Sequence, residues 1–318
     1  ERYTRALSLS RLAYDLENIV SPMLAALLLA FVSYNALFFG TVVGFVGSAL
    51  LVISVMLPSP KPPKPRGIYD RTTRGMRIYL ATPRLRGLLM LNFAAAAAGA
   101  MVLVNTVVLV RSDLGLGDPQ VAIALCAFGG GSMLAALLLP RLLDNRPDRS
   151  VMIGGAVVLV MALLALSLIA LVYDTQWIPL LAGWFIIGIG YSAVLTPSGR
   201  LLKRSAHAED RPAVYAAQFA LSHACWLVTY PLAGWLITVS GPTAAFAVLA
   251  VLAGVGMVCG SALWTQESGE PVTHFHDDLP KDHPHVQDGR THSHPIIIDD
   301  YHSHWPRVRE IDSHSDRR

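Results

Sequence analysis

Eight long apolar runs constrain the fold of this chain more than any other feature of its sequence. About 20 apolar residues, at a helical rise of 1.5 Å each, cross a hydrocarbon core of roughly 30 Å. Each run predicts a helix, because backbone polar groups cannot stay unpaired in lipid and the runs are too long for barrel strands. The sequence therefore predicts an all-α membrane protein with eight transmembrane helices. The runs cover residues 12–33, 35–57, 87–110, 119–140, 151–173, 177–199, 212–237 and 243–264.

The composition agrees with a membrane location. Hydrophobic residues make up 53% of the 318 residues and charged residues only 15%, whereas a soluble domain needs roughly a quarter charged residues. The positive residues lie in short segments between the runs and do not follow one helix face, so they indicate no nucleic-acid partner. The composition excludes a soluble globular domain and predicts the lipid bilayer as a partner.

The positive residues between the runs predict the orientation of the chain. Fifteen of them lie in three alternate segments, and only Arg111 lies on the other side. Lys and Arg concentrate in cytoplasmic loops. We therefore expect a multi-pass protein of a bacterial-type inner (plasma) membrane, with the beginning of the chain and the C-terminal tail in the cytoplasm. The fifteen residues are Lys61, Lys64, Arg66, Arg71, Arg74, Arg77, Arg84, Arg86, Arg141, Arg146, Arg149, Arg200, Lys203, Arg204 and Arg211.

A Pro-, Lys- and Arg-rich segment at residues 58–86 separates the first two runs from the last six. Its X-Pro steps predict an extended cytoplasmic linker. The two-plus-six arrangement suggests an internal repeat, and placing Pro22 on Pro231 aligns LENIVSPMLAALL with CWLVTYPLAGWLI. The first two runs therefore look like the counterpart of the last two. The predicted divisions are residues 1–57, the end of one half; 58–86, the linker; 87–264, a complete six-helix half; and 265–318, a His-rich tail without regular structure.

The stretch LVRSDLGLGDPQVAIALCAFGGGSMLAALLLPRLLDNRPDRSVMIGG, residues 109–155, resembles the major facilitator superfamily of transporters. The resemblance implies the fifth to twelfth helices of a twelve-helix bundle, so we expect four helices to precede Glu1. The stretch holds a weakened copy of the family's loop motif G-x-x-x-D-R-x-G-R-R, with Asp144 and Arg149 in matching places. In the family these residues brace neighbouring helix ends and control the conformational change, which is the role implied for Asp144 and Arg149. The departures from the motif are Pro140, Asn145, Pro147 and Asp148.

Polar residues separate the runs expected to face a cavity from those expected to face lipid. The runs at 35–57, 151–173 and 243–264 are almost uniformly apolar, which is typical of a helix against lipid. Polar residues at membrane depth are costly and usually face a cavity or the bundle interior. The resemblance places the two polar runs, 87–110 and 177–199, at the family's central cavity. Their candidate residues are Asn92, Asn105 and Thr106, and Tyr191, Ser192, Thr196 and Ser198.

The run at 212–237 carries a polar stripe in which one residue recurs every four positions. The stripe consists of Gln218, Ser222, Trp226 and Tyr230, with Thr229 on the same face. His223 borders the stripe, and its imidazole can carry a proton near neutral pH, which suits a proton relay. The alternative is a histidine satisfied by a neighbouring hydroxyl group.

The first run holds charged candidates. Arg11 and Asp15 lie four residues apart, which favours an ion pair near a helix end, and Asn18 follows on the same side. Glu17 has no partner in its own helix, and we interpret it as a candidate proton carrier or cation site.

Nine of the eleven histidines lie in the tail between residues 274 and 314, and eight of them form H-x-H pairs. In an extended chain, residues i and i+2 point to the same side, so each pair can present two imidazoles to one Ni²⁺, Co²⁺, Zn²⁺ or Cu²⁺ ion. The tail resembles the His-rich tails of nickel and cobalt resistance permeases of the superfamily. The alternative is a solvated tail without specific binding. The pairs are His274/His276, His283/His285, His292/His294 and His302/His304.

The function that these observations predict is secondary active transport of a small solute by alternating access, with proton-coupled efflux. The solute is a drug, a metabolite or a divalent metal ion such as nickel or cobalt. No enzymatic activity is expected, because the G-x-S-x-G and H-E-x-x-H motifs are absent from the sequence. We also expect no required cofactor and a monomeric state of the complete protein. The alternative is a membrane-anchored metal-binding or metal-sensing protein that does not transport.

Overall fold

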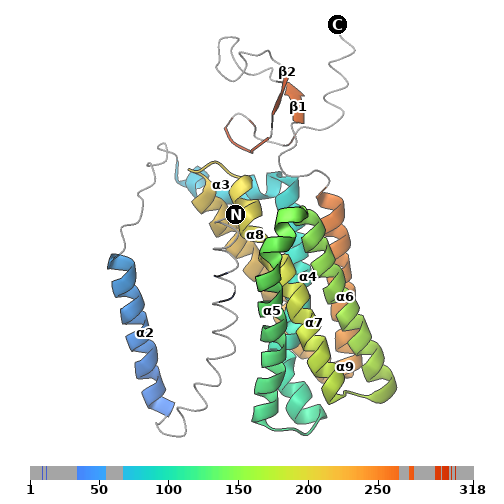
Figure 1. Cartoon of the computed structure of the whole chain (residues 1–318). Coiled ribbons are helices and arrows are strands. Elements are labelled where there is room, and N and C mark those ends of the chain that lie inside the picture. The colour runs from blue at the N-terminus through green and yellow to red at the C-terminus, as the bar shows by residue number, and fades with distance from the viewer. Residues whose placement is uncertain are drawn as a thin grey trace.

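Helices form most of the protein that the structure describes (Figure 1). The computed structural model describes residues 34–54, 67–264, 272–275, 291–294 and 296–300, with Leu9, Leu12, His302 and Trp305. Most of the run at 12–33, with Asp15 and Glu17, lies outside these residues. The elements are α2 (Tyr34–Ser54), α3 (Ile68–Ala81), α4 (Pro83–Val108), the π-helix η1 (Leu109–Asp113), α5 (Asp118–Asn145), α6 (Asp148–Tyr173), α7 (Trp177–Leu195), α8 (Ser198–Arg204), α9 (Arg211–Leu263), β1 (Val272–Phe275) and β2 (Thr291–His294).

The predicted count of eight membrane helices is not confirmed. In the part of the chain that the structure describes, five helices are long and apolar enough to cross a membrane, with α9 counted once, and α2 adds the shorter apolar stretch Phe38–Ser54. The helices α4 to α7 agree with the runs predicted for them. The runs at 212–237 and 243–264 also form helical segments, which meet at a kink at Gly241 and together make up the 53-residue element α9. The membrane part is all-α, as the apolar runs predict.

The long helix α9 contains a reversal at Gly241. A straight helix of this length would extend about 80 Å, yet the residues at both of its ends contact the region where α3 meets α4. Asp210, just before α9, pairs with Arg74, and Gly260 near its end packs against Gly87. Gly241 has φ 77° and ψ 176°, which only glycine adopts at low cost. Two antiparallel segments therefore stand where the sequence predicted two helices joined by a loop.

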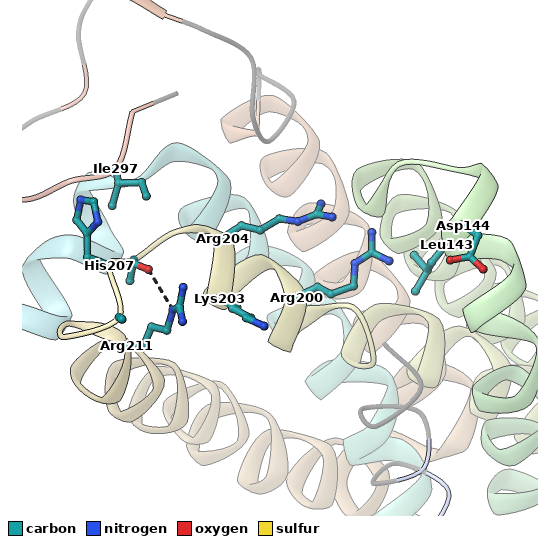
Figure 2. A pocket seen from close by; sticks show the side chains of 10 residues that line it. Leu143, Asp144, Arg200, Lys203, Arg204, His207, Arg211 and Ile297 are labelled. Carbon is teal, nitrogen blue, oxygen red and sulfur yellow. Dashed lines mark hydrogen bonds between the residues drawn. The ribbon is translucent and has the colours of Figure 1, made fainter. Parts of the chain in front are cut away.

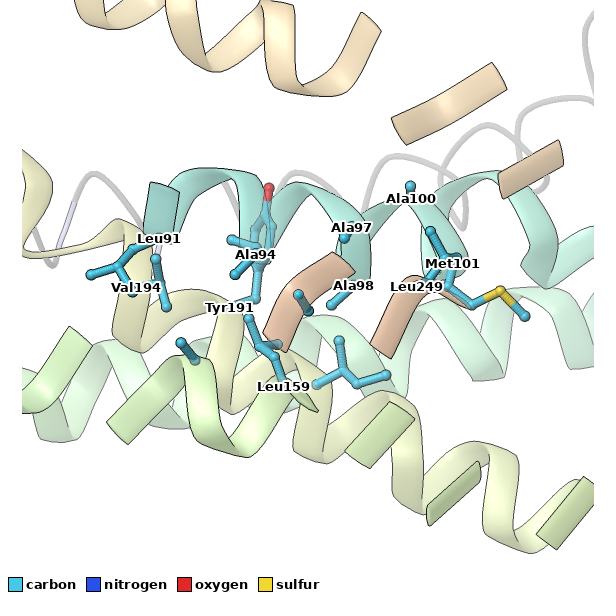
Figure 3. Close-up of a cluster of buried hydrophobic side chains, with 14 of the residues drawn as sticks. Leu91, Ala94, Ala97, Ala98, Ala100, Met101, Leu159, Tyr191, Val194 and Leu249 are labelled. Atoms are coloured by element: carbon cyan, nitrogen blue, oxygen red, sulfur yellow. The ribbon is translucent and has the colours of Figure 1, made fainter. Parts of the chain in front are cut away.

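The helix α4 lies at the centre of the bundle and is the most deeply buried of the membrane helices. Its small residues from Ala94 to Ala100 let neighbouring helices approach closely (Figure 3). An added Cβ at Gly87 would lie 2.7 Å from the Cβ of Trp264, and one at Gly256 would lie 2.7 Å from the carbonyl oxygen of Met90. Glycine is therefore required at both of these contacts between α4 and α9.

The second part of the predicted linker is helical and packed, which corrects the expectation of an extended chain. The proline-rich residues 58–66 lie outside the described residues, while Ile68–Ala81 form the amphipathic helix α3. Ile78 and Tyr79 are buried in the core. Pro83 does not interrupt a helix, because it stands at the first turn of α4, where a proline needs no N–H partner.

The described part of the tail lies at the end of the bundle where α3 and α8 are found, with β1 and β2 beyond that end (Figure 1). Strands β1 and β2 pair antiparallel, so regular structure is present where none was expected. Beyond them, Ile296 and Ile298 are buried, and Ile298 belongs to the main hydrophobic core. This part of the tail is therefore packed against the membrane domain.

Candidate functional site

A polar cavity of about 180 Å³ opens between α4, α7, α8 and α9. It brings together five of the predicted candidates, Asn92, Ser198, Gln218, Ser222 and Trp226, from helices that are far apart in the sequence. Three of the five belong to the stripe on α9. The other lining residues are Ala95 and Leu195.

The Asn92 side chain is the most unusual group in this cavity. It is 3% exposed, and neither its Nδ2 nor its Oδ1 atom has a hydrogen-bond partner among the described residues. Mutational data show that a buried amide without partners lowers the free energy of unfolding by roughly 1–3 kcal/mol. Asn92 thus offers both a donor and an acceptor to whatever occupies the cavity.

A residue of the surface helix α3 orients the Gln218 side chain. Its Oε1 atom accepts a hydrogen bond from the hydroxyl group of Tyr79 in α3, at 2.5 Å. Burial raises the pKa of the Tyr79 phenol far above its ordinary value, with a smaller contribution from Cys225. The phenol therefore stays protonated and keeps donating to Gln218 at any physiological pH.

Aromatic rings extend from one side of the cavity. The Trp226 ring lies 6.1 Å from Tyr191 and 4.7 Å from Tyr230, both in edge-on geometry, and Tyr191 lies 5.5 Å from Phe128. Gly99 makes room for Trp226, since a Cβ there would lie 2.6 Å from the indole Cη2. These contacts hold the indole of Trp226 at the cavity wall.

Other predicted cavity residues act in helix packing instead. Asn105 donates from Nδ2 to the carbonyl oxygen of Ala233 at 3.0 Å and so joins α4 to α9. Ser192 and Thr196 lie 3.3 Å apart through their hydroxyl oxygens within one helical turn. None of these three residues lines the described cavity.

His223 lies outside the cavity on an exposed face of α9. Its Nδ1 atom is 2.7 Å from the carbonyl oxygen of Phe219, so this nitrogen carries the donated proton. Its ring also lies 4.0 Å from the Phe219 ring. The partner of His223 is thus a backbone carbonyl and not the hydroxyl group that the alternative interpretation named.

The loop between α5 and α6 places its charges differently from the motif. Arg149 donates to the carbonyl oxygens of Trp264 and Ser261, at 2.8 and 3.0 Å, and so caps the end of α9. Asp144 is exposed and forms no ion pair with any described residue. Asp148 is 5% exposed and pairs with Arg200 at 3.1 Å and Arg204 at 3.2 Å. The motif comparison missed Asp148, although an acid in the first turn of a helix is itself a sequence signal.

Charged contacts concentrate at the end of the bundle that carries the basic loops. Arg74 of α3 binds Asp210 through Nε at 2.5 Å and Nη2 at 2.9 Å, and reaches Asp300 of the tail through Nη1 at 2.7 Å. The hydrogen bond to Asp210 is the main reason that the pKa of Arg74 is raised above its ordinary value. Arg84 donates to Ser205 at 2.7 Å. These contacts join α3, α4, the tail and the loop before α9.

The histidines of the tail are only partly described. His274 pairs with His292 in the register of β1 and β2, and His294 pairs with Val272. His302 is buried and contacts Asp299 through Nδ1 at 3.1 Å. Within the described ranges, three or more potential ligands do not come together in a group that could hold a metal ion. His276, His283, His285 and His304 lie outside the described residues.

Comparison with known proteins identifies the family. The family model described as Major Facilitator Superfamily matches residues 88–291. A search of curated proteins finds no match. The matched region contains most of α4, all of α5 to α9, and every residue that lines the polar cavity. Because the match covers more than half of the chain and its helices form an all-α membrane bundle, this protein belongs to the major facilitator superfamily.

Proposed function

We propose that this secondary transporter of a small solute works by alternating access, with proton-coupled efflux and with the polar cavity as part of its solute site. The observation that carries the proposal is the buried Asn92 amide, whose two polar atoms have no partner in the part of the chain that the structure describes. Among apolar helices, such a group is costly unless a solute or water binds it. Secondary transporters hold their solute near the midplane in this way.

The chemistry of the cavity supports a polar organic solute more than a divalent cation. The described lining offers amide and hydroxyl groups and an indole, from Asn92, Gln218, Ser198, Ser222 and Trp226. Hard divalent cations require several oxygen ligands, usually including carboxylates, and nickel or cobalt requires imidazole or similar donors. A drug or metabolite therefore fits this lining better than nickel or cobalt, although both remain in the proposal.

Proton coupling rests on two titratable residues. His223 carries an imidazole on the face of α9 next to the cavity stripe, and imidazole changes charge near neutral pH. Glu17 lies outside the described residues and remains a proposal from the sequence. Replacement of Glu17 by Gln or His223 by Asn is expected to abolish the dependence of transport on a pH gradient while solute binding persists.

A flux assay in liposomes tests the transport proposal, with ethidium and Ni²⁺ as probes. The variant Asn92→Leu removes the amide donor and acceptor of Asn92 from the cavity. Its flux of whichever probe the wild type transports is expected to fall at least 10-fold. Ser167→Ala is the matched control, because it also removes a polar group from a membrane helix but bonds Thr243 away from the cavity. Equal flux in wild type and Asn92→Leu would refute the role of the cavity.

A second candidate function is metal capture by the tail, which would also serve the alternative of a metal-binding or metal-sensing membrane protein. The register that pairs His274 with His292 supports it, since partners in an antiparallel ladder lie about 5 Å apart. Calorimetric titration of the whole chain with Ni²⁺ is expected to show binding. The double variant His292→Asn/His294→Asn is expected to weaken this binding at least 10-fold. The control His207→Asn/His223→Asn removes two histidines outside the tail. Equal binding by both double variants would exclude His292 and His294 as ligands.

A further inference from the structure

A basic pocket of about 630 Å³ lies between the end of α5, the short helix α8 and the beginning of α9 (Figure 2). Figure 2 shows Arg200, Lys203 and Arg204 from α8 along one side, and His207 and Arg211 at the other end. Asp144 is the carboxylate in its described lining. This pocket is separate from the polar cavity, and the proposed transport cycle does not use it.

The charges around this basic pocket leave a positive excess. Four guanidinium or ammonium groups line it. Three described carboxylates lie close to them: Asp144 in the lining, the buried Asp148, which is shared by Arg200 and Arg204, and Asp299, which contacts His207. Arg211 uses its Nε atom to bond the carbonyl oxygen of Ala206, at 3.3 Å, which holds its guanidinium beside the pocket. An anion that enters is therefore attracted by more positive than negative charge.

The basic pocket lies where three membrane-crossing segments begin or end, at Asn145, at Arg204 and at Arg211. These segments have 28 residues or more, whereas about 20 residues cross the hydrocarbon core, so their ends extend to the headgroups. Basic pockets between membrane helices at this level bind phosphate-bearing headgroups.

The tail forms one wall of the basic pocket. Ile297 lines the pocket, and its neighbours Ile296 and Ile298 are buried. Asp299 lies 3.3 Å from the ring of His207, which makes a second attachment next to the pocket. The pocket is thus built by three parts of the chain, the end of α5, the segment from Arg200 to Arg211, and the tail. The last two meet through His207 and Asp299, which are 92 positions apart.

We propose that the basic pocket binds a phosphate group, carried either by an anionic lipid or as free phosphate. Planar guanidinium groups bind phosphate oxygens in pairs, and the lysine supplies a further point charge. The ligand is held at the rim of the membrane domain between α5, α8 and the tail. Its binding stabilises the folded state by mass action.

Thermal unfolding of the whole chain in detergent micelles tests this proposal. The probes are phosphatidylglycerol, phosphatidylcholine as its neutral counterpart, and inorganic phosphate. The expected result is a saturable rise of the melting temperature with phosphatidylglycerol or with inorganic phosphate, but not with phosphatidylcholine. A response to phosphatidylglycerol alone assigns a lipid headgroup, and a response to inorganic phosphate that competes with the lipid assigns free phosphate.

Two double variants show whether this pocket is responsible. Lys203→Gln/Arg211→Gln is expected to raise the probe concentration that gives half of the maximal rise in melting temperature about 30-fold. Each basic residue near a membrane surface contributes roughly 5-fold to the affinity. Arg141→Gln/Arg146→Gln removes two exposed positive charges from the same end of the bundle but outside the pocket, and is expected to change it less than 2-fold. Should the first variant fail to fold, the single change Lys203→Gln at an exposed position is expected to cost about 5-fold. The proposal is overturned if neither phosphate probe stabilises the protein, or if pocket and control variants weaken the response equally.

Discussion

The phenol of Tyr79 donates a hydrogen bond to Oε1 of Gln218 and so connects the surface helix α3 to the polar cavity. The two residues are 139 positions apart. Tyr79 is fully buried and belongs to the segment between two predicted halves, whereas Gln218 lies in a membrane-crossing helix. A change in the position of α3 would therefore alter the orientation of a cavity side chain directly.

Removal of this hydroxyl group is expected to destabilise the protein. Tyr79→Phe leaves the Gln218 oxygen without its donor, and loss of one partner of a buried hydrogen bond costs about 1–3 kcal/mol in the free energy of unfolding. Chemical unfolding in detergent micelles measures the difference. Tyr69→Phe, at a position 77% exposed on the same helix, is the control and is expected to be neutral. Identical stability of the two variants would mean that the hydrogen bond does not orient Gln218.

The pair formed by Arg74 and Asp210 is expected to be a strong link between α3 and α9. Their side chains are only 12% and 7% exposed, so removal of one partner leaves a poorly solvated charge. Arg74→Gln is expected to cost about 3 kcal/mol of unfolding free energy, and a double-mutant cycle with Asp210→Asn should give a coupling of about 1–3 kcal/mol.

The neighbouring pair of Arg77 and Asp70 provides the control for this prediction. Arg77 is 55% exposed, and exposed ion pairs contribute about 0–1 kcal/mol. Arg77→Gln is accordingly expected to change the unfolding free energy by less than 1 kcal/mol. A coupling between Arg74 and Asp210 as small as that of the exposed pair would contradict the burial argument.

The two acids of the loop between α5 and α6 are expected to differ sharply. Asp148→Asn removes the buried carboxylate that faces Arg200 and Arg204, and is expected to cost about 3–5 kcal/mol. Asp144→Asn, at an exposed position, is expected to change stability by no more than about 0.5 kcal/mol. The melting temperatures of the two variants, measured in parallel, show which acid contributes more to stability. A larger effect at Asp144 would restore the role that the loop motif implies for it.

A side chain at Gly241 is expected to oppose the reversal of α9. With φ 77° and ψ 176°, Gly241→Ala should cost about 1–3 kcal/mol in unfolding free energy, although no atom crowds the position. Gly254→Ala, in the second segment of α9 and equally uncrowded, lies in regular helix and is expected to be neutral or stabilising. Urea or heat unfolding of both variants measures the contrast. A harmless Gly241→Ala would mean that the reversal does not need glycine.

The sequence predicted the helices better than it predicted their contacts. The apolar runs at 119–140 and 151–173 correspond to α5 and α6, because the cost of exposing backbone to lipid depends on local composition and length. The last two runs form two helical segments as predicted, but the sequence did not show that a single glycine with positive φ, Gly241, connects them. The segment after Gly67 was predicted to be an extended linker, but it forms the helix α3. The sequence did not reveal this helix, because contacts with the region of α9 stabilise it and its own hydropathy does not.

The candidate residues divide in the same way. The four-residue spacing on α9 places Gln218, Ser222 and Trp226 on one stripe, and these three residues line one cavity. No local pattern separates Asn92, which faces that cavity, from Asn105, which bonds a carbonyl group of α9. Both are asparagines in the same apolar helix, and only the neighbouring helix determines that Asn105 keeps one unsatisfied atom, Oδ1, whereas Asn92 keeps two.

The sequence alone determined that this chain enters a membrane as helices, because lipid requires long apolar segments that satisfy their own hydrogen bonds. It also determined which end of the bundle collects the positive residues. Tertiary structure decided which polar groups meet at the cavity, that Asp148 and not Asp144 opposes the arginines, and that the tail closes one side of the basic pocket. These outcomes depend on contacts between residues more than 50 positions apart, such as the 56 that separate Asp148 from Arg204, and no local pattern contains them.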